Sequence, residues 1–114
     1  MKGKSPSAAQ KRFHDLLATH IGCQACFADA GMRNTYVSIH HIDGRTKPHA
    51  HWHVLALCAG HHQQGYGALG MIAVHPNKAR FEAQYGRQLD LLSQAVTELQ
   101  AQGHELPAEA LALI

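Results

Sequence analysis

Two pairs of metal-binding residues, each with two residues between its ligands, are the part of this chain best suited to chemistry. The first pair is Cys23 and Cys26, and the second is Cys58 and His61. This spacing lets a tight turn point both ligands at one tetrahedral Zn²⁺ ion, and the two pairs use all three cysteines of the chain. Four protein ligands leave no open coordination position, so the spacing predicts a structural zinc that supports the fold.

A second group of candidate residues follows from the concentration of histidine in one window of the sequence. Eleven histidines occur, and most of them fall between residues 40 and 75. Imidazole binds metals when it is neutral and exchanges protons near pH 7. We therefore expect a second site, able to do chemistry, at His40, His41, Asp43 and His62. Neighbouring strand residues point to opposite faces, so His40 and His41 should diverge. They could converge if the strand ends or bulges there. Alternatively, His41 and Asp43, two residues apart, share the active face.

Three further patterns are less specific. His49, His51 and His53 alternate and could line one face of a strand, but Pro48 and the polar neighbours favour a loop. The glycines of residues 65–70 spell G-x-G-x-x-G without a buried strand before them, which indicates a loop and no dinucleotide site. His75 has three open roles: capping a helix, touching DNA or joining a metal.

The elements that must position these residues follow from periodicity and turn signals. An apolar stripe predicts a helix over residues 7–20, beginning at Ser5–Pro6 or at the competing cap Ser7. β-branched and aromatic residues predict strands over 36–42 and 54–57, with a short helix beginning near Gly60.

The C-terminal third is expected to be helical. One helix begins at His75–Pro76 and ends at Gly86, and a longer helix follows it to about residue 102. Residues 104–114 form a last turn or a frayed acidic tail. At 114 residues we expect one domain over 1–114, of α+β class, with a zinc-stapled hairpin between flanking helices.

The charge of the chain is divided unevenly along it. Residues 1–87 hold all ten Lys and Arg with half of the eight acids, whereas residues 88–114 hold the remaining acids and no Lys or Arg. A basic body suits a polyanion such as nucleic acid. The basic arm of residues 1–6 has no apolar stretch behind it, and no run reaches the length of a membrane span. We therefore expect a cytoplasmic protein with reduced cysteines and no membrane partner.

Three segments together are specific enough to compare with a known family: YVSIHHIDGRTKP (36–48), LCAGHHQ (57–63) and IAVHPNKARF (72–81). They resemble the Ref family, the RecA-dependent nucleases of phages and prophages, within the HNH (His-Me finger) endonucleases. The resemblance covers roughly residues 20–92. It implies a ββα-metal core, cleavage of DNA phosphodiesters, and direction of that cleavage by a RecA filament in a bacterial host.

Carried over by position, the resemblance makes His41 the general base and gives His40 and His62 the places of metal ligands. Asp43 is an alternative carboxylate ligand or orients His41, and His53 occupies the place of the middle Asn of the HNH pattern. The expected catalytic ion is Mg²⁺ or another divalent cation, since imidazoles would also suit Zn²⁺, Mn²⁺ or Ni²⁺. The cations placed to contact DNA are Arg45, Lys47, Lys78 and Arg80, with Arg33 as a further candidate.

The sequence therefore predicts a metal-dependent DNA endonuclease that acts with RecA filaments in recombination. The alternative is a non-catalytic zinc module that binds DNA or a recombination protein. A zinc deaminase is set aside because the H-x-E motif that such enzymes need is absent from the sequence.

Overall fold

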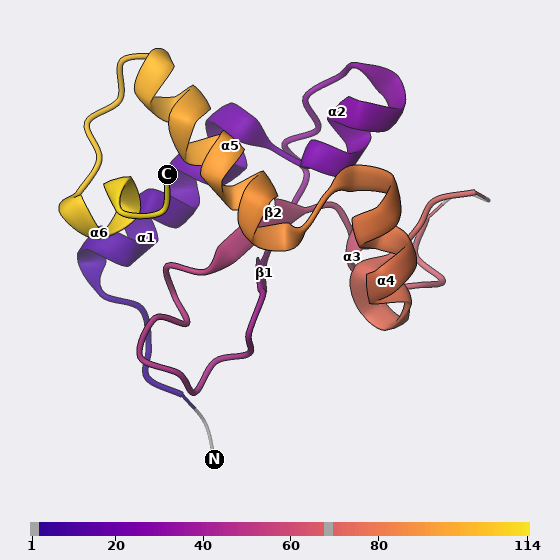
Figure 1. Ribbon diagram of the computed structural model, residues 1–114, viewed down its shortest axis with the longest axis horizontal. Coiled ribbons are helices and arrows are strands. Elements are labelled where there is room, and N and C mark those ends of the chain that lie inside the picture. Colours follow the sequence, from indigo (N-terminus) through magenta and orange to yellow (C-terminus); the bar gives the residue numbers. More distant parts are fainter. Residues whose placement is uncertain (1–2, 68–69) are drawn as a thin grey trace.

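The chain folds as a small α+β protein in which one two-stranded sheet is surrounded by helices (Figure 1). A computed structural model describes residues 3–67 and 70–114. Residues 1 and 2 of the expected basic arm, and residues 68 and 69 of the expected glycine-rich loop, lie outside the described residues. No helix in the described part of the chain is long and apolar enough to cross a membrane.

The N-terminal helix begins at Ser7. The Ser7 hydroxyl accepts from the Gln10 backbone N–H, and the Gln10 side chain accepts from the Ser7 N–H. This capping box satisfies two free backbone donors, so the start at Ser5–Pro6 is wrong and the competing cap Ser7 is confirmed. Helix α1 (Ala8–Leu16) continues into a π-helical segment, η1 (Leu17–Ile21), and together they match the helix expected over residues 7–20.

Helix α2 (Gln24–Ala30), which the sequence analysis did not predict, follows the first cysteine. Strands β1 (Ser38–His41) and β2 (Val54–Leu57) then pair antiparallel in a regular register, with His40 opposite Leu55 and His41 opposite Val54. Helix α3 (Ala59–His62) starts directly after β2. The strand expected over 36–42 is therefore shorter, while the second strand and the short helix near Gly60 are confirmed.

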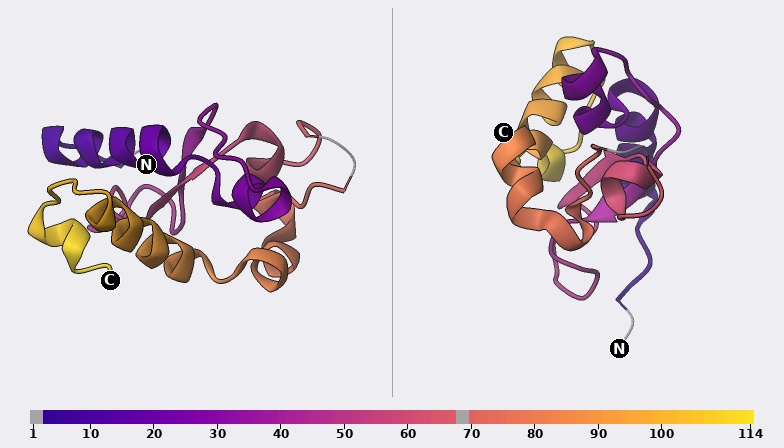
Figure 2. Two further views of the ribbon diagram at one scale, coloured as in Figure 1. Left: turned by 90° about the horizontal axis from the view of Figure 1, so that it is seen from above. Right: turned by 90° about the vertical axis from the view of Figure 1, so that its right-hand side faces the viewer.

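All four residues of β2 are buried, because helices cover the strand from more than one side. Segment η1 and helix α5 (Gln88–Ala101) both pack against β2 and against each other. Seen from above, α1 and α5 run along opposite sides of the molecule (Figure 2). The largest buried side chains of this core include Phe13, Leu17, Leu55, Leu57, Leu92, Val96 and Leu99.

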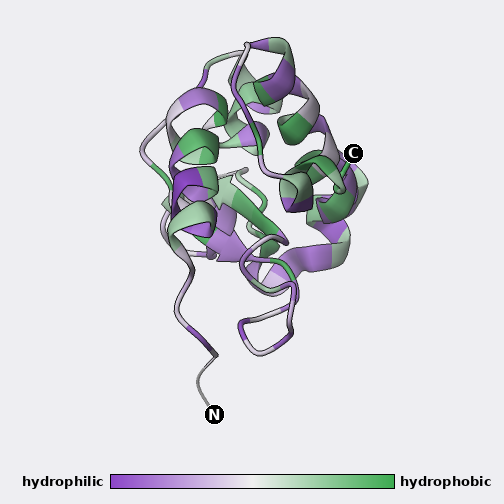
Figure 3. Ribbon diagram, turned by 90° about the vertical axis from the view of Figure 1, so that its left-hand side faces the viewer, coloured by the Kyte–Doolittle hydropathy of each residue, from purple (hydrophilic) through white to green (hydrophobic). Residues whose placement is uncertain are grey.

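Helix α4 (Val74–Tyr85) ends at Gly86, as expected, and leads into α5. The last segment carries one short helix, α6 (Ala108–Leu111), which is the last turn among the two expected alternatives. The long loop between β1 and β2 projects from the body and is mostly hydrophilic to neutral in colour (Figure 3). The N-terminal arm lies against this loop. The approach is so close that a Cβ atom added at Gly3 would collide with the backbone carbonyl of Arg45.

Candidate metal centres

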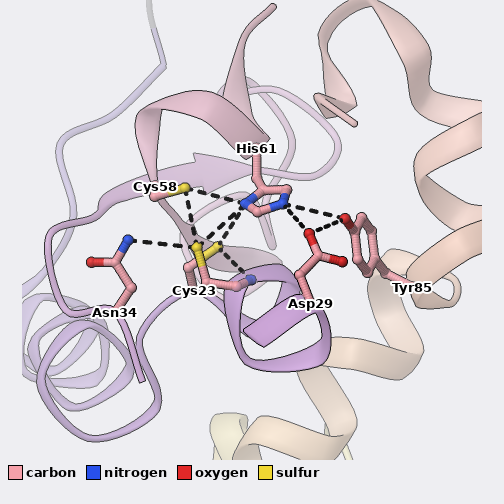
Figure 4. A network of polar contacts seen from close by, with 7 residues as sticks. Cys23, Asp29, Asn34, Cys58, His61 and Tyr85 are labelled. Carbon is pink, nitrogen blue, oxygen red and sulfur yellow. Dashed lines mark hydrogen bonds and ion pairs between the residues drawn. The ribbon is translucent and has the colours of Figure 1, made fainter. Parts of the chain in front are cut away.

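The first centre brings together the four ligands predicted from the paired spacing, Cys23, Cys26, Cys58 and His61 (Figure 4). The Sγ atoms of Cys26 and Cys58 are 3.5 Å apart, and His61 Nδ1 lies 3.2 to 3.6 Å from the three sulfurs. A tetrahedral zinc with Zn–S bonds of about 2.3 Å has S···S edges of about 3.8 Å. The cluster could therefore hold a metal ion such as Zn²⁺.

The ligands of this centre are placed by two helix starts and one glycine. Cys23 is the N-cap of α2, and Cys58 is the N-cap of α3. Gly22 has φ +69°, and a Cβ atom there would lie 2.5 Å from the carbonyl oxygen of Asn34. The Cys23 N–H donates to that same carbonyl at 2.9 Å. Only glycine fits this close, left-handed turn, which fixes the direction in which Cys23 enters the centre.

Two residues that the sequence analysis missed orient the histidine ligand. His61 Nε2 donates to Asp29 Oδ2 at 3.0 Å, and the Tyr85 hydroxyl donates to the same oxygen at 2.7 Å. A carboxylate on the far nitrogen fixes the proton there and leaves Nδ1 free to face the sulfurs. Asp29 lies three residues after Cys26 on α2, and this helical spacing is the signal that could have identified it.

The thiols of this centre need a cation to become ligands. Burial raises the pKa of the Cys23 thiol to about 12, and burial also raises the pKa of Cys26. A thiol binds metal only as the thiolate, so the donor set is stable in its charged form when a cation balances it.

The second centre consists of His40, His62 and His75, which come from β1, α3 and the start of α4. Their ring centroids are 5.1 Å apart for His40 and His62, 5.1 Å for His40 and His75, and 5.3 Å for His62 and His75. His40 is buried, His62 is partly buried and His75 is exposed. The centre thus opens toward solvent on the His75 side and could hold a metal ion.

His75 reaches this centre because the chain after the glycine-rich loop returns alongside α3. Gln63 and His75 form a parallel bridge, and the Gln64 N–H donates to the His75 carbonyl at 2.9 Å. His61 and His62, adjacent on α3, face different centres, as expected from the 100° step of a helix.

A buried amide orients His40. His40 Nε2 lies 2.7 Å from Gln88 Oε1, and Gln88 Nε2 donates to Glu82 Oε2 at 3.3 Å. Since the amide nitrogen is used by the carboxylate, Oε1 accepts the proton of His40 Nε2, which leaves His40 Nδ1 as the unprotonated nitrogen. Burial lowers the pKa of His40 to about 4, so this imidazole is neutral at pH 7. Sequence spacing could not reveal a partner 48 residues away.

His41 lies on the other face of β1 and belongs to a different group of side chains. Its Nε2 is 3.0 Å from His51 Nδ1, and the His51 Nε2 donates to the backbone carbonyl of Lys4. His14 Nε2 donates to the His51 carbonyl at 2.7 Å. The expected convergence of His41 with His40 or His62 therefore does not occur, because β1 pairs regularly through His41 without a bulge.

The environment of His41 keeps it unprotonated. Burial, assisted by the nearby positive charge of Arg45, lowers the pKa of His41 to about 4. His41 has His51 as its hydrogen-bond partner, whereas His53, which occupies the place of the middle Asn of the HNH pattern, faces Asp43.

The third group is Asp43, His49 and His53, on the loop between the strands. Asp43 Oδ2 lies 3.2 Å from His49 Nε2 and 3.6 Å from His53 Nδ1. Asp43 was expected either as a ligand beside His40 and His62 or as the partner of His41. The structure gives it these two loop histidines as partners instead.

The four cations expected to contact DNA are all exposed and lie in two places. Arg45 and Lys47 are on the loop between β1 and β2, and Lys78 and Arg80 are on α4. Lys78 lines a cavity of about 350 Å³ together with Asp43 and Gln88, the residue that orients His40. Arg45 lies close enough to His41 to lower its pKa, and Lys78 shares a cavity with the amide that orients His40.

These features define a class: a small α+β protein with a Cys₃His cluster that could hold a metal such as Zn²⁺. The model of one protein family, described as "Recombination enhancement, RecA-dependent nuclease", matches residues 6–100. The chain belongs to this family, which confirms the resemblance to the Ref-type nucleases. The family description indicates a nuclease with a RecA-dependent role in recombination.

Proposed function

We propose that this protein is a metal-dependent DNA endonuclease of HNH type. The observation that carries the proposal is the arrangement at the end of β1. His40 is part of the three-histidine centre and the next residue, His41, is held by its own hydrogen-bonded partner, so a candidate metal centre and an uncharged imidazole are carried by adjacent residues. The order β1, β2, α3 is consistent with the ββα-metal core of HNH enzymes.

Two kinds of metal site follow from the donor sets. Cys23, Cys26, Cys58 and His61 would hold a structural Zn²⁺, because the four donors fill a tetrahedron. His40 and His62, joined by His75, would hold the catalytic divalent ion; three imidazoles suit a transition metal such as Zn²⁺ or Ni²⁺ better than Mg²⁺, which prefers oxygen ligands. When bound, such an ion supplies positive charge to the phosphate and to the leaving oxygen.

The general base in this proposal is His41, and its tautomer is set by a chain of hydrogen bonds. The Lys4 carbonyl can only accept, so His51 Nε2 carries a proton and His51 Nδ1 is an acceptor. His41 Nε2 must then carry the proton in the contact with His51 Nδ1. His41 Nδ1 is left with a free lone pair, the group that would take a proton from the attacking water.

Bound DNA would bring the pKa of His41 closer to the value that a general base needs at neutral pH. Arg45 is one of the causes that lower the pKa of His41 in the free protein. A phosphate held by Arg45 would offset this positive charge, and the pKa of His41 would rise toward neutrality. The bound substrate would therefore make His41 a stronger base than it is in the free protein.

The substrate and partner in this proposal are DNA and a RecA filament. Arg45, Lys47, Lys78 and Arg80 would contact the phosphate backbone, since they are exposed on the loop between the strands and on α4. Asp43 is not assigned a step, because its contacts in the structure are to His49 and His53.

The decisive experiment is a cleavage assay of His41→Ala against the wild type on DNA coated with RecA, with Mg²⁺, Mn²⁺, Zn²⁺ or Ni²⁺ supplied in turn. We expect the substitution to reduce cleavage by about 10²–10⁴-fold, the usual contribution of a general base. His104→Ala is the matched control, because His104 stacks on His20 at 4.3 Å, away from the metal centres. It should cleave like the wild type.

The rival hypothesis is a zinc module that binds DNA or a recombination protein without cutting. It predicts that the wild type and His41→Ala have equal activity, or that neither cleaves with any divalent metal. Zinc content and thermal melting of each variant would show that the compared proteins are folded.

A further inference from the structure

The loop between β1 and β2 carries a third group of metal-binding side chains that the proposed reaction does not use. These are Asp43, which follows β1, and His49 and His53, which precede β2. One donor atom from each residue lies within 4.8 Å of the other two. The side chains of His49, His53 and Asp43 are 41, 22 and 37% exposed, so an ion from solvent could reach them.

The backbone presents the two histidines as neighbours on one turn. The His53 N–H donates to the His49 carbonyl at 3.0 Å, a single helical turn that puts residues i and i+4 on the same side. Their ring centroids are 4.0 Å apart. Two histidines four residues apart on one helical face are an established arrangement for binding Zn²⁺.

The third ligand is held in place by the strand. The Ile42 N–H donates to the His53 carbonyl at 3.0 Å, which fixes the start of β2 against the end of β1. Asp43 follows Ile42 directly, so its carboxylate is presented across the base of the loop to both rings. Asp43 Oδ2 faces His49 Nε2 at 3.2 Å and His53 Nδ1 at 3.6 Å.

One nitrogen of this group has no hydrogen bond. His53 Nδ1 is buried, and it has no hydrogen-bond partner among the described residues. Its 3.6 Å separation from the carboxylate is longer than a hydrogen bond. A buried polar atom without a partner is unfavourable, and a cation between the two rings and the carboxylate would satisfy it.

We propose that Asp43, His49 and His53 form a binding site for a divalent transition-metal ion such as Zn²⁺. Two imidazoles and one carboxylate suit Zn²⁺, Co²⁺ or Ni²⁺, whereas Mg²⁺ prefers oxygen ligands alone. Three protein ligands leave a coordination position open for water or for a phosphate oxygen. Because the site is more exposed than the Cys₃His centre, its ion exchanges with the solution.

A metal here would fix the loop that borders the base. The loop carries Arg45 and Lys47 at its tip and His51, the partner of His41, near its end. An ion that joins Asp43 to His49 and His53 would link the outgoing and returning arms of this loop. The predicted consequence is a more ordered loop, with its cations held close to the open coordination position.

The site can be tested by titrating Zn²⁺ alone into the protein at neutral pH. The Cys₃His centre is filled with Zn²⁺ beforehand. The background is His62→Ala, which removes one ligand of the three-histidine centre. The readout is the imidazole ¹⁵N and ¹H chemical shifts of His49 and His53 in NMR spectra. We expect both to shift together and to saturate, with the affinity at least about tenfold weaker in Asp43→Asn and in His49→Gln.

Asp90→Asn and His20→Gln, changed in the same background, are the matched controls and should leave the titration unchanged. The proposal is overturned if the resonances of His49 and His53 do not move at millimolar Zn²⁺. It is also overturned if Asp43→Asn and His49→Gln bind as tightly as the background protein. Neither outcome depends on DNA cleavage, so the proposed nuclease function is tested separately.

Discussion

The roles proposed for the histidines depend on the partner that each ring nitrogen has. His61 gives one nitrogen to Asp29 and turns the other to the thiols, and His40 gives one to Gln88 and keeps the other free. His41 gives its proton-bearing nitrogen to His51. In each case a neighbour selects the tautomer, so chemically identical side chains could serve as ligand or as base.

At the residue scale, His51 should act as a positioning residue for His41. His51→Ala removes the acceptor for His41 Nε2, so we expect cleavage to fall by about 10–100-fold. His51→Asn should restore most of the activity, because an amide can accept from His41 and donate to the Lys4 carbonyl, as the histidine does.

The measurement is kcat as a function of pH for the wild type and both variants, with zinc content as the check on folding. A purely structural role for His51 would lower the stability of both variants alike and leave the pH profile in place. Equal activity of His51→Ala and the wild type would contradict the positioning role of His51.

At the scale of the elements, the sequence predicted what depends on local patterns. The helix over residues 7–20, the strand at 54–57 and the cluster of Cys23, Cys26, Cys58 and His61 follow from local spacing and residue types, and the structure has all of them. Helix α2 was missed, because the Cys23–Cys26 pair was interpreted as a turn. The partners Asp29, Tyr85 and Gln88 depend on helices packing across the molecule, which short-range spacing does not encode.

Strand geometry predicted the separation of His40 from His41. Alternation in β1 puts the two side chains on opposite faces, and only a bulge or the end of the strand would bring them together. The regular register shows that alternation holds. His75 then takes the place in the centre that His41 does not.

The hydrogen bond from His61 on α3 to Asp29 on α2 leads to a prediction about zinc affinity. Asp29→Asn keeps the shape of the side chain but weakens the acceptor for His61 Nε2, so the affinity for Zn²⁺ should fall by about 10–100-fold. Asp15→Asn, on α1, is the control and should not change it. Competition against a chelator of known affinity measures the difference.

Loss of zinc should also release both helix starts together, because each contributes two ligands. Removal of the metal from the wild type should therefore expose the amides of α2 and α3 to hydrogen exchange while those of α5 stay protected. Unchanged affinity in Asp29→Asn would mean that the carboxylate does not support the ligand.

At the scale of the whole molecule, the fold brings distant segments against the hairpin. The arm at Lys4, helix α1 at His14 and the loop at Arg45 all lie close to His41 or His51. Enclosing an imidazole in this way excludes water from it, which is why burial is the first cause of the lowered pKa of His41 and of His14.

This enclosure makes the folded state sensitive to acid. An unfolded histidine has a pKa near 6.5, whereas burial lowers the pKa of His41 to about 4 in the folded protein. Between these values the unfolded chain binds a proton that the folded chain does not, so stability is full above pH 6.5 and falls as the pH drops toward 4. His14, whose pKa is also lowered, adds to the same slope.

The variant His41→Gln should therefore take up about one proton less on unfolding near pH 5 than the wild type. The measurement is the slope of unfolding free energy against pH from 7 to 4.5, with His104→Gln as the control that keeps the wild-type slope. Acid release of a metal from the Cys₃His centre would lower the stability of the wild type and of both variants alike, since neither substitution changes a residue of that centre. An identical slope for His41→Gln and the wild type would mean that His41 is protonated as easily in the folded protein as in the unfolded chain, and the enclosure of the base would then be wrong.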